Sequence, residues 1–150
     1  MVPERNGCKV LRMQAGEKWI IRDKQRFLRV LMDRLAGTAS MSFEGDLSGC
    51  KLHALPNASE AESNLLRRNT IWPKQDFITV PLEKESTKPI VSALGGTIPK
   101  PILHIQIEKD GQLQVGMYDQ RFAAFSATPL SQALKAQLIE ERVIVRADHR

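Results

Sequence analysis

Alternation of apolar and polar residues predicts a first pair of strands at 39–44 and 50–55. Every second residue of both segments is apolar, so one face of the pair can be buried while the other stays polar. The register that keeps both apolar sets on one face places Phe43 opposite Cys50 and leaves a loop at 45–48. We therefore predict a hairpin here.

A second hairpin is predicted where 102–108 and 112–118 alternate in the same way around an Asp-Gly turn. A two-residue loop would put the apolar residues of the two strands on different faces. A three-residue loop at 109–111, with its glycine in the left-handed conformation, keeps them together and places Ile107 opposite Leu113. We expect the second arrangement.

Further extended segments are predicted at 76–82 and at 143–146, where apolar residues again alternate or run together. Pro81 has no backbone N–H donor, which places it near a strand end or on an edge strand. Weaker alternation at 8–13 and 18–21 predicts a short hairpin near the amino terminus.

Helical spacing of apolar residues, together with capping residues, predicts four helices. The first has Phe27, Leu28, Leu31 and Leu35 on one face and ends at Gly37, which suits a left-handed stop. A short second helix follows a Ser-x-x-Glu capping box and ends near residue 69. The third ends at a Gly-Gly pair, and the last opens with Thr-Pro. The residues predicted to cap them are, in order, Asp23, Ser59, Ser86 and Thr128.

The order of these elements predicts an α+β fold with a mainly antiparallel sheet and helices packed on one face. Residues 120–127 show no regular pattern, and we expect Phe122 and Phe125 to fold back onto the body. The sheet is expected to be built from the two hairpins, 39–44/50–55 and 102–108/112–118.

The composition is that of a globular protein, because 42% of the 150 residues are hydrophobic and 26% are charged. This length suits a single α+β domain spanning 1–150. Cys8 and Cys50 are too few for a disulfide framework and are not spaced for zinc. No apolar run is long enough for a signal peptide or a membrane span, so we expect a cytoplasmic protein that does not contact membranes.

Positive charge is concentrated near the amino terminus. Residues 1–34 hold nine basic and four acidic residues, a surplus of five that equals the net charge of +5 of the whole chain. Such an asymmetry indicates an acidic partner, although a merely soluble surface explains it as well. Arg22, Arg26 and Arg29 have helical spacing and Arg67-Arg68 form a second cluster. The predicted partner-binding residues are therefore Arg22, Arg26, Arg29, Arg67 and Arg68.

The sequence shows no recognisable catalytic or metal-binding grouping. His53, His104 and His149 have no ligand partners at metal spacing, and we expect the first two on the solvent side of strands. Cys50 and His53 would project from opposite faces of one strand, which excludes a thiol–imidazole pair. Serine nucleophile and phosphate-loop motifs are missing, and the carboxylates at the hairpin loops suit turns. We expect no metal and no cofactor.

This lack of grouped chemistry favours a binding protein over an enzyme. The leading hypothesis is a non-enzymatic protein-binding module, such as an inhibitor, an adaptor or a toxin-neutralising immunity protein, that contacts an acidic partner surface. One alternative is a small nucleic-acid-binding or regulatory protein that uses the basic helix. Aromatics make up only 5% of the chain, and Trp19 and Phe27 are expected in the core or its flank. The other alternative is an enzyme with a dispersed site.

Overall fold

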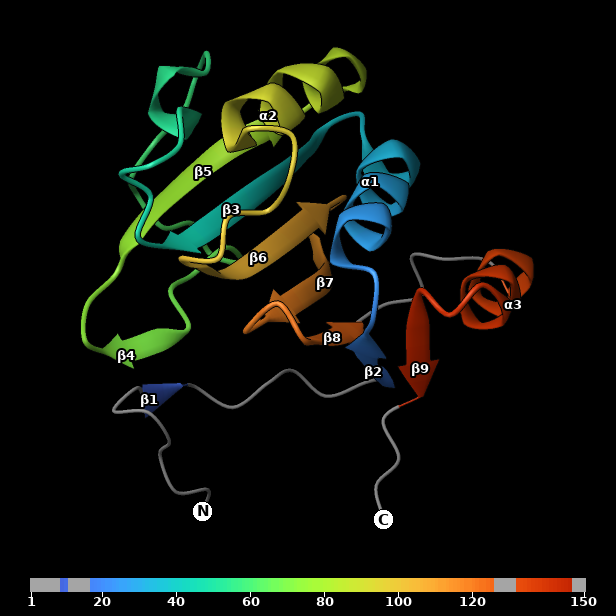
Figure 1. Cartoon of the computed structure of the whole chain (residues 1–150). Coiled ribbons are helices and arrows are strands. Elements are labelled where there is room, and N and C mark those ends of the chain that lie inside the picture. The colour runs from blue at the N-terminus through green and yellow to red at the C-terminus, as the bar shows by residue number, and fades with distance from the viewer. Residues whose placement is uncertain (1–8, 11–16, 126–131, 147–150) are drawn as a thin grey trace.

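A computed structural model describes residues 9–10, 17–125 and 132–146 (Figure 1). Its helices are interspersed among the strands along the chain. In order, they are β1 (Lys9–Val10), β2 (Glu17–Ile21), α1 (Lys24–Leu35), β3 (Ala39–Gly45), the 3-10 helix η1 (Leu52–Ala54), β4 (Thr70–Trp72), β5 (Asp76–Leu82), the 3-10 helix η2 (Lys84–Ser86), α2 (Thr87–Leu94), β6 (Ile102–Lys109), β7 (Gln112–Tyr118), β8 (Phe122–Phe125), α3 (Gln132–Glu140) and β9 (Ile144–Arg146).

Within the described residues, seven strands form one antiparallel sheet in the order β5-β3-β6-β7-β8-β2-β9. Strands β1 and β4 form a separate two-stranded ribbon. Figure 1 shows α1 and α2 on one side of the sheet and the β1–β4 ribbon on the other. The predicted α+β class with a mainly antiparallel sheet is confirmed.

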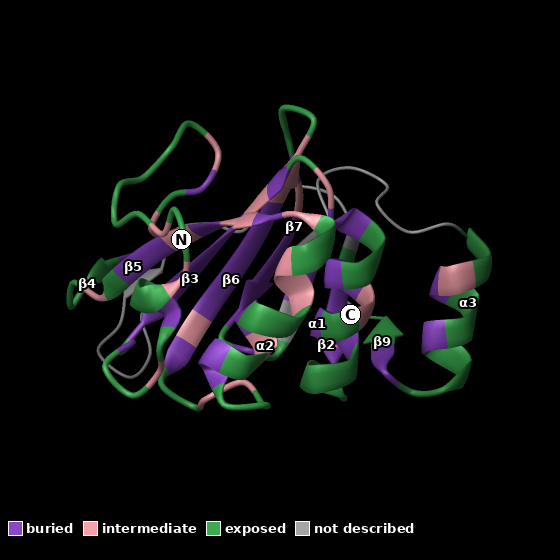
Figure 2. Cartoon of the chain, turned by 90° about the horizontal axis from the view of Figure 1, so that it is seen from above, coloured by how far each residue is buried: buried purple, intermediate pink, exposed green. Residues whose placement is uncertain are grey.

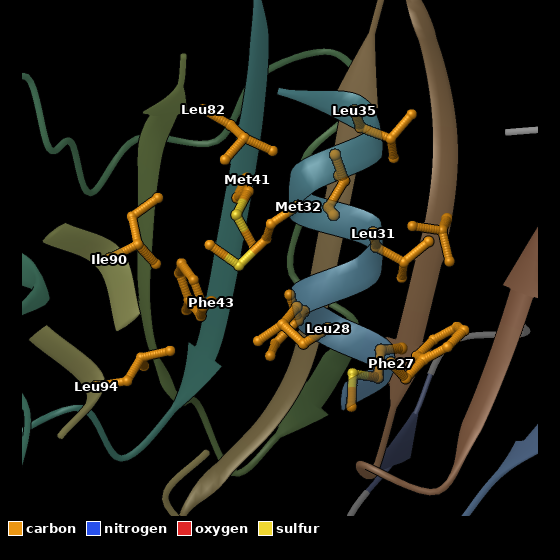
Figure 3. Close-up of a cluster of buried hydrophobic side chains, with 14 of the residues drawn as sticks. Phe27, Leu28, Leu31, Met32, Leu35, Met41, Phe43, Leu82, Ile90 and Leu94 are labelled. Carbon is orange, nitrogen blue, oxygen red and sulfur yellow. The ribbon is translucent and has the colours of Figure 1, made fainter. Parts of the chain in front are cut away.

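The core lies between the sheet and the helices, where purple, buried segments of strand and helix face each other in Figure 2. Helix α1 supplies one complete apolar face, and β3 meets it with Met41 and Phe43 (Figure 3). Helices α1, α2 and α3 each contribute buried residues to this cluster. The buried residues of α1 are Phe27, Leu28, Leu31, Met32 and Leu35.

Local signals place most of the helix ends as expected, but Ser86 makes no side-chain capping bond to α2. Its hydroxyl accepts the Glu83 N–H at 3.0 Å, at the start of the 3-10 helix η2 that precedes α2. The Asp23 carboxylate accepts the Arg26 N–H at 3.1 Å, which satisfies one of the free donors of the first turn of α1. Helix α2 ends at Gly95, whose φ of 89° is left-handed. Pro81 lies on β5, an edge strand of the sheet, where its missing N–H costs no ladder bond. The residue predicted to cap the last helix, Thr128, lies outside the described residues.

The first predicted hairpin is wrong in its second strand. Residues 50–55 contain the 3-10 helix η1, and Phe43 instead lies opposite Ile78 on β5 and Ile105 on β6. Leu52 is buried between exposed neighbours, and a tight turn produces this short alternation as readily as a strand does. Because β3 is an interior strand, two long strands from later in the chain take up both of its edges.

The second hairpin is confirmed in its strands but has a different register. The loop has two residues, Asp110 and Gly111, with φ of 56° and 75°, the left-handed pair that a tight hairpin turn requires. A register shift between Ile107 and Glu108 then brings Ile107 opposite Val115. The irregularity lies within the strand, so the three-residue loop expected from the pattern is wrong.

The short helix predicted from a capping box at Ser59 is also wrong, because residues 59–69 form no helix. The Ser59 N–H donates to the Thr79 carbonyl at 2.9 Å, which adds a bridge to the edge of β5. The Glu62 carboxylate accepts the Arg68 N–H at 3.0 Å. Both capping residues are therefore used by contacts outside a helix.

Two predictions about short segments are wrong for the same reason: a short sequence pattern does not show which distant strand the segment pairs with. Strand β2 pairs with β8 and β9, whereas β1 pairs with β4, so the amino-terminal hairpin is wrong. Residues 120–127, expected to be irregular, contain the interior strand β8. The side chains of Phe122 and Phe125, like Cys8 and His149, lie outside what the structure describes.

Gly45 is required where β3 meets the start of β6. Its φ is 149°, and a Cβ atom there would lie 2.2 Å from the Pro101 carbonyl oxygen. We expect Gly45→Ala to lower the free energy of unfolding by about 3 kcal/mol, because backbone on both sides must move. Gly49→Ala is the matched control, since a Cβ at Gly49 meets nothing within 4 Å.

Urea denaturation of the two variants measures this difference. The control is expected to stay within about 0.5 kcal/mol of the unmodified protein. Equal stability of both variants would contradict the close approach of β3 and β6 at this point.

Candidate functional site

The sheet has a second, polar face on the side away from α1 and α2. Phe43 and Ile105 point into the core, so their neighbours Glu44 and His104, which are opposite each other, point to the other face. Tyr118 lies next to His104 on the following strand. All three polar side chains are buried. Burial of such groups requires partners, and the chain that covers this face supplies them for Glu44 and for Nε2 of His104.

Glu44 fixes the covering chain through its carboxylate, which is only 1% exposed. It accepts the Asn69 N–H at 2.7 Å and the Thr70 N–H at 3.1 Å. Burial raises the pKa of Glu44, while these two hydrogen bonds and the nearby charge of Arg68 oppose the rise. Without the two N–H donors of this segment, the Glu44 carboxylate would be buried with no hydrogen bonds, so its contribution to stability depends on the segment staying in place.

His104 makes the second connection to the same segment. Its Nε2 lies 2.8 Å from the Thr70 hydroxyl oxygen, and its Nδ1 accepts the Asp119 N–H at 3.3 Å. Because Nδ1 acts as an acceptor, the hydrogen bonds assign a neutral ring with its proton on Nε2, which donates to Thr70. Burial lowers the pKa of His104, and the charge of Asp119 opposes the shift. The His104 side chain is 2% exposed.

Gln106 completes the attachment. Its Oε1 accepts the Arg67 N–H at 3.1 Å and the Ser42 hydroxyl at 3.2 Å. Three backbone N–H groups, those of residues 67, 69 and 70, thus donate to side chains of β3 and β6. We call residues 66–70, anchored in this way, the covering segment. Its Leu66 side chain packs in a small apolar cluster with Phe77 and Leu113.

Tyr118 closes the polar face at its β7 side. Its ring lies 5.6 Å from that of His104, centroid to centroid, and its hydroxyl sits over Gly116. A Cβ at Gly116 would be 2.1 Å from that hydroxyl oxygen, so glycine is needed there to make room. Burial raises the pKa of Tyr118. The ring is therefore held as a neutral, buried wall of the site.

Immediately after the covering segment, β4 carries large apolar side chains into solvent. Ile71 is 57% exposed and Trp72 is 65% exposed, although both follow a buried, doubly bonded Thr70. Strand β1 pairs with β4 along this ribbon. Successive residues of a strand point to opposite faces, so Ile71 and Trp72 expose apolar surface on both faces of the ribbon. Exposed apolar surface bordered by polar residues is typical of an interaction site.

The predicted arginines lie on both sides of the sheet. Arg22 precedes α1, so the expected three-residue helical stripe contains only Arg26 and Arg29 within the helix, and Arg26 pairs with Glu141. On the other side, Arg67 lies 3.5 Å from Glu62, and the Arg68 guanidinium stacks 5.2 Å from the centre of the Phe77 ring. The two clusters cannot form one surface, and their role in binding stays a prediction.

The expectations for the histidines need correction. His104 lies on a strand, but the prediction that it faces solvent is wrong, because the covering segment buries it in the polar face. His53 belongs to η1, and its Nε2 lies 3.5 Å from the Glu60 Oε2. The argument that excluded a Cys50–His53 pair assumed a strand at these residues, and the structure has none there. The Cys50 thiol instead donates to the Leu47 carbonyl oxygen at 3.3 Å. A polar residue flanked by apolar ones inside a strand was the available signal for His104.

Both ring nitrogens of His104 and both oxygens of Glu44 have hydrogen-bond partners within the protein, three of them in the covering segment. In the part of the chain that the structure describes, no three His, Cys, Asp or Glu side chains are grouped to hold a metal ion. Among the same residues, no helix has the length and apolar character needed to cross a membrane. No family model, no curated protein and no solved structure matches this chain.

The lowered pKa of His104 makes stability depend on pH. As pH falls below the ordinary value of 6.5, the unfolded chain binds the proton before the folded one, so the free energy of unfolding decreases. The raised pKa of Glu44 has the opposite sign and offsets part of the loss closer to its ordinary value of 4.5. We expect the urea midpoint to fall between pH 7.5 and pH 5.5 by more in the unmodified protein than in His104→Gln. Parallel curves for the two proteins would show that His104 is not a buried neutral ring.

Proposed function

We propose that the protein is a non-enzymatic protein-binding module of the inhibitor, adaptor or immunity type. Its contact surface is the exposed ribbon at Ile71 and Trp72, with Arg67 and Lys74 at the border. The observation that carries this proposal is the exposure of two large apolar side chains on a strand whose preceding residues are fixed to the sheet. Tryptophan and arginine are frequent centres of binding energy in protein interfaces.

A protein partner is favoured over nucleic acid by the charges around the ribbon. Nucleic-acid binding needs a surplus of cations that displaces counterions from phosphates. Here Glu60, Glu62 and Asp76 lie on the same side of the molecule, and Glu62 lies within ion-pair distance of Arg67. An exposed tryptophan can also stack on a base, so recovered nucleic acid is the alternative outcome of the test.

The test compares affinity capture from the native host by the unmodified protein, Trp72→Ser and Ile139→Ser. Ile139 on α3 is 43% exposed and provides a matched apolar residue elsewhere on the surface. We expect a specific acidic protein to be retained by the unmodified protein and by Ile139→Ser. Its affinity for Trp72→Ser is expected to be weaker by about 30-fold, the effect of removing a central interface residue.

Both substitutions remove exposed atoms, so the urea midpoints should stay close to that of the unmodified protein and exclude unfolding as the cause. Identical recovery with Trp72→Ser would contradict the proposed surface. A capture lost on nuclease treatment would favour the nucleic-acid alternative.

A further inference from the structure

A polar cavity of about 310 Å³ lies next to the ribbon. It is formed where the η1 loop, the covering segment and the start of β5 meet. Lys74, two residues after Trp72, belongs to its wall and is exposed. The cavity is lined by His53, Glu60, Arg68, Lys74, Gln75, Asp76 and Phe77.

The two carboxylates of the cavity are already engaged. The Asp76 Oδ2 accepts the Leu47 N–H at 3.0 Å, which ties the loop after β3 to the start of β5. The Glu60 Oε2 lies 3.5 Å from the Nε2 of His53. Both acceptor carboxylates of the cavity therefore already have partners within the protein.

The cations of the cavity have unused donors. The Nη1 atom of Arg68 is buried and has no hydrogen-bond partner, and the guanidinium is held in place over the Phe77 ring. The Arg68 charge acts on Glu44, yet no acceptor oxygen bonds this nitrogen. Among the described residues, Lys74 makes no ion pair or hydrogen bond. Nη1 is closed to solvent, so a ligand in the cavity would meet the other guanidinium nitrogens of Arg68. These are accessible and make no hydrogen bond among the described residues, and an oxyanion would supply their acceptor.

We propose that this cavity binds a side-chain carboxylate of the partner protein, between Arg68 and Lys74. The inference rests on the proposed function and names the chemistry of the partner: an apolar side chain against Trp72, with an aspartate or glutamate beside it. A single carboxylate fits a cavity that also contains Glu60 and Asp76, whereas a polyanion would meet their repulsion. Arginine and lysine together provide the charge-assisted hydrogen bonds such a group requires.

The test titrates the isolated protein with sodium acetate while amide shifts of Gln75 and Phe77 are followed by NMR at constant ionic strength. Sodium chloride provides the baseline, and inorganic phosphate is a separate arm. We expect acetate to produce saturable shifts at these residues, with an apparent Kd about fivefold weaker in Lys74→Gln. Lys88→Gln, an exposed lysine on α2, is the control and should bind acetate like the unmodified protein.

Acetate shifts equal to those of chloride, or the same Kd in Lys74→Gln, would overturn the proposal. A saturable response to phosphate without one to acetate would also overturn it, because the cavity would then select a phosphate group. Trp72→Ser should leave the acetate titration unchanged. Failure of the ribbon as a docking surface and failure of the cavity as a carboxylate site are therefore distinguishable.

Discussion

The buried pair formed by Glu44 and His104 is the constraint on which the other features of this molecule depend. The two residues are opposite each other on neighbouring interior strands, and both bond Thr70 of the chain that covers them. A carboxylate and an imidazole with almost no exposure are tolerated only if their hydrogen bonds are satisfied. The covering segment is therefore a structural requirement of the sheet, and the sheet determines where that segment lies.

This requirement gives the two faces of the sheet different tasks. The face under α1 and α2 is apolar, and packing against Phe43 and its neighbours supplies most of the burial. On the polar face, side chains of the sheet satisfy the backbone of a segment that has no helix and enters a strand only at its last residue, Thr70. Thr70 is fixed in this way, so Ile71 and Trp72 are presented to solvent from a defined position despite the absence of a long strand around them. Preorganisation of this kind reduces the entropy lost when a partner binds.

The sequence predicted what depends on neighbours along the chain, and it missed what depends on distant partners. The first helix, the strand at 76–82 and both strands of the second hairpin follow from spacing, capping and a turn signal, which are local. Gly45, the last residue of β3, pairs with Asp76 on one side and with Ile102 on the other. These partners lie 31 and 57 positions later in the chain, so no local pattern identifies them. The same limit hid the site, since the covering chain that buries His104 is far from it in sequence. The sequence predicts a helix that ends near residue 69 and no strand after it, so the exposure of Trp72 follows only from the pairing of β4 with β1.

Hydrogen exchange at the backbone amides of Asn69 and Thr70 tests most directly whether the buried carboxylate holds the covering segment. In the unmodified protein, these two amides are predicted to exchange as slowly as those of β3 and β6, because they open only when Glu44 loses both bonds. In Glu44→Gln they are predicted to exchange much faster while the sheet amides remain protected. Exchange of both amides at the rate of an exposed loop in the unmodified protein would contradict the account.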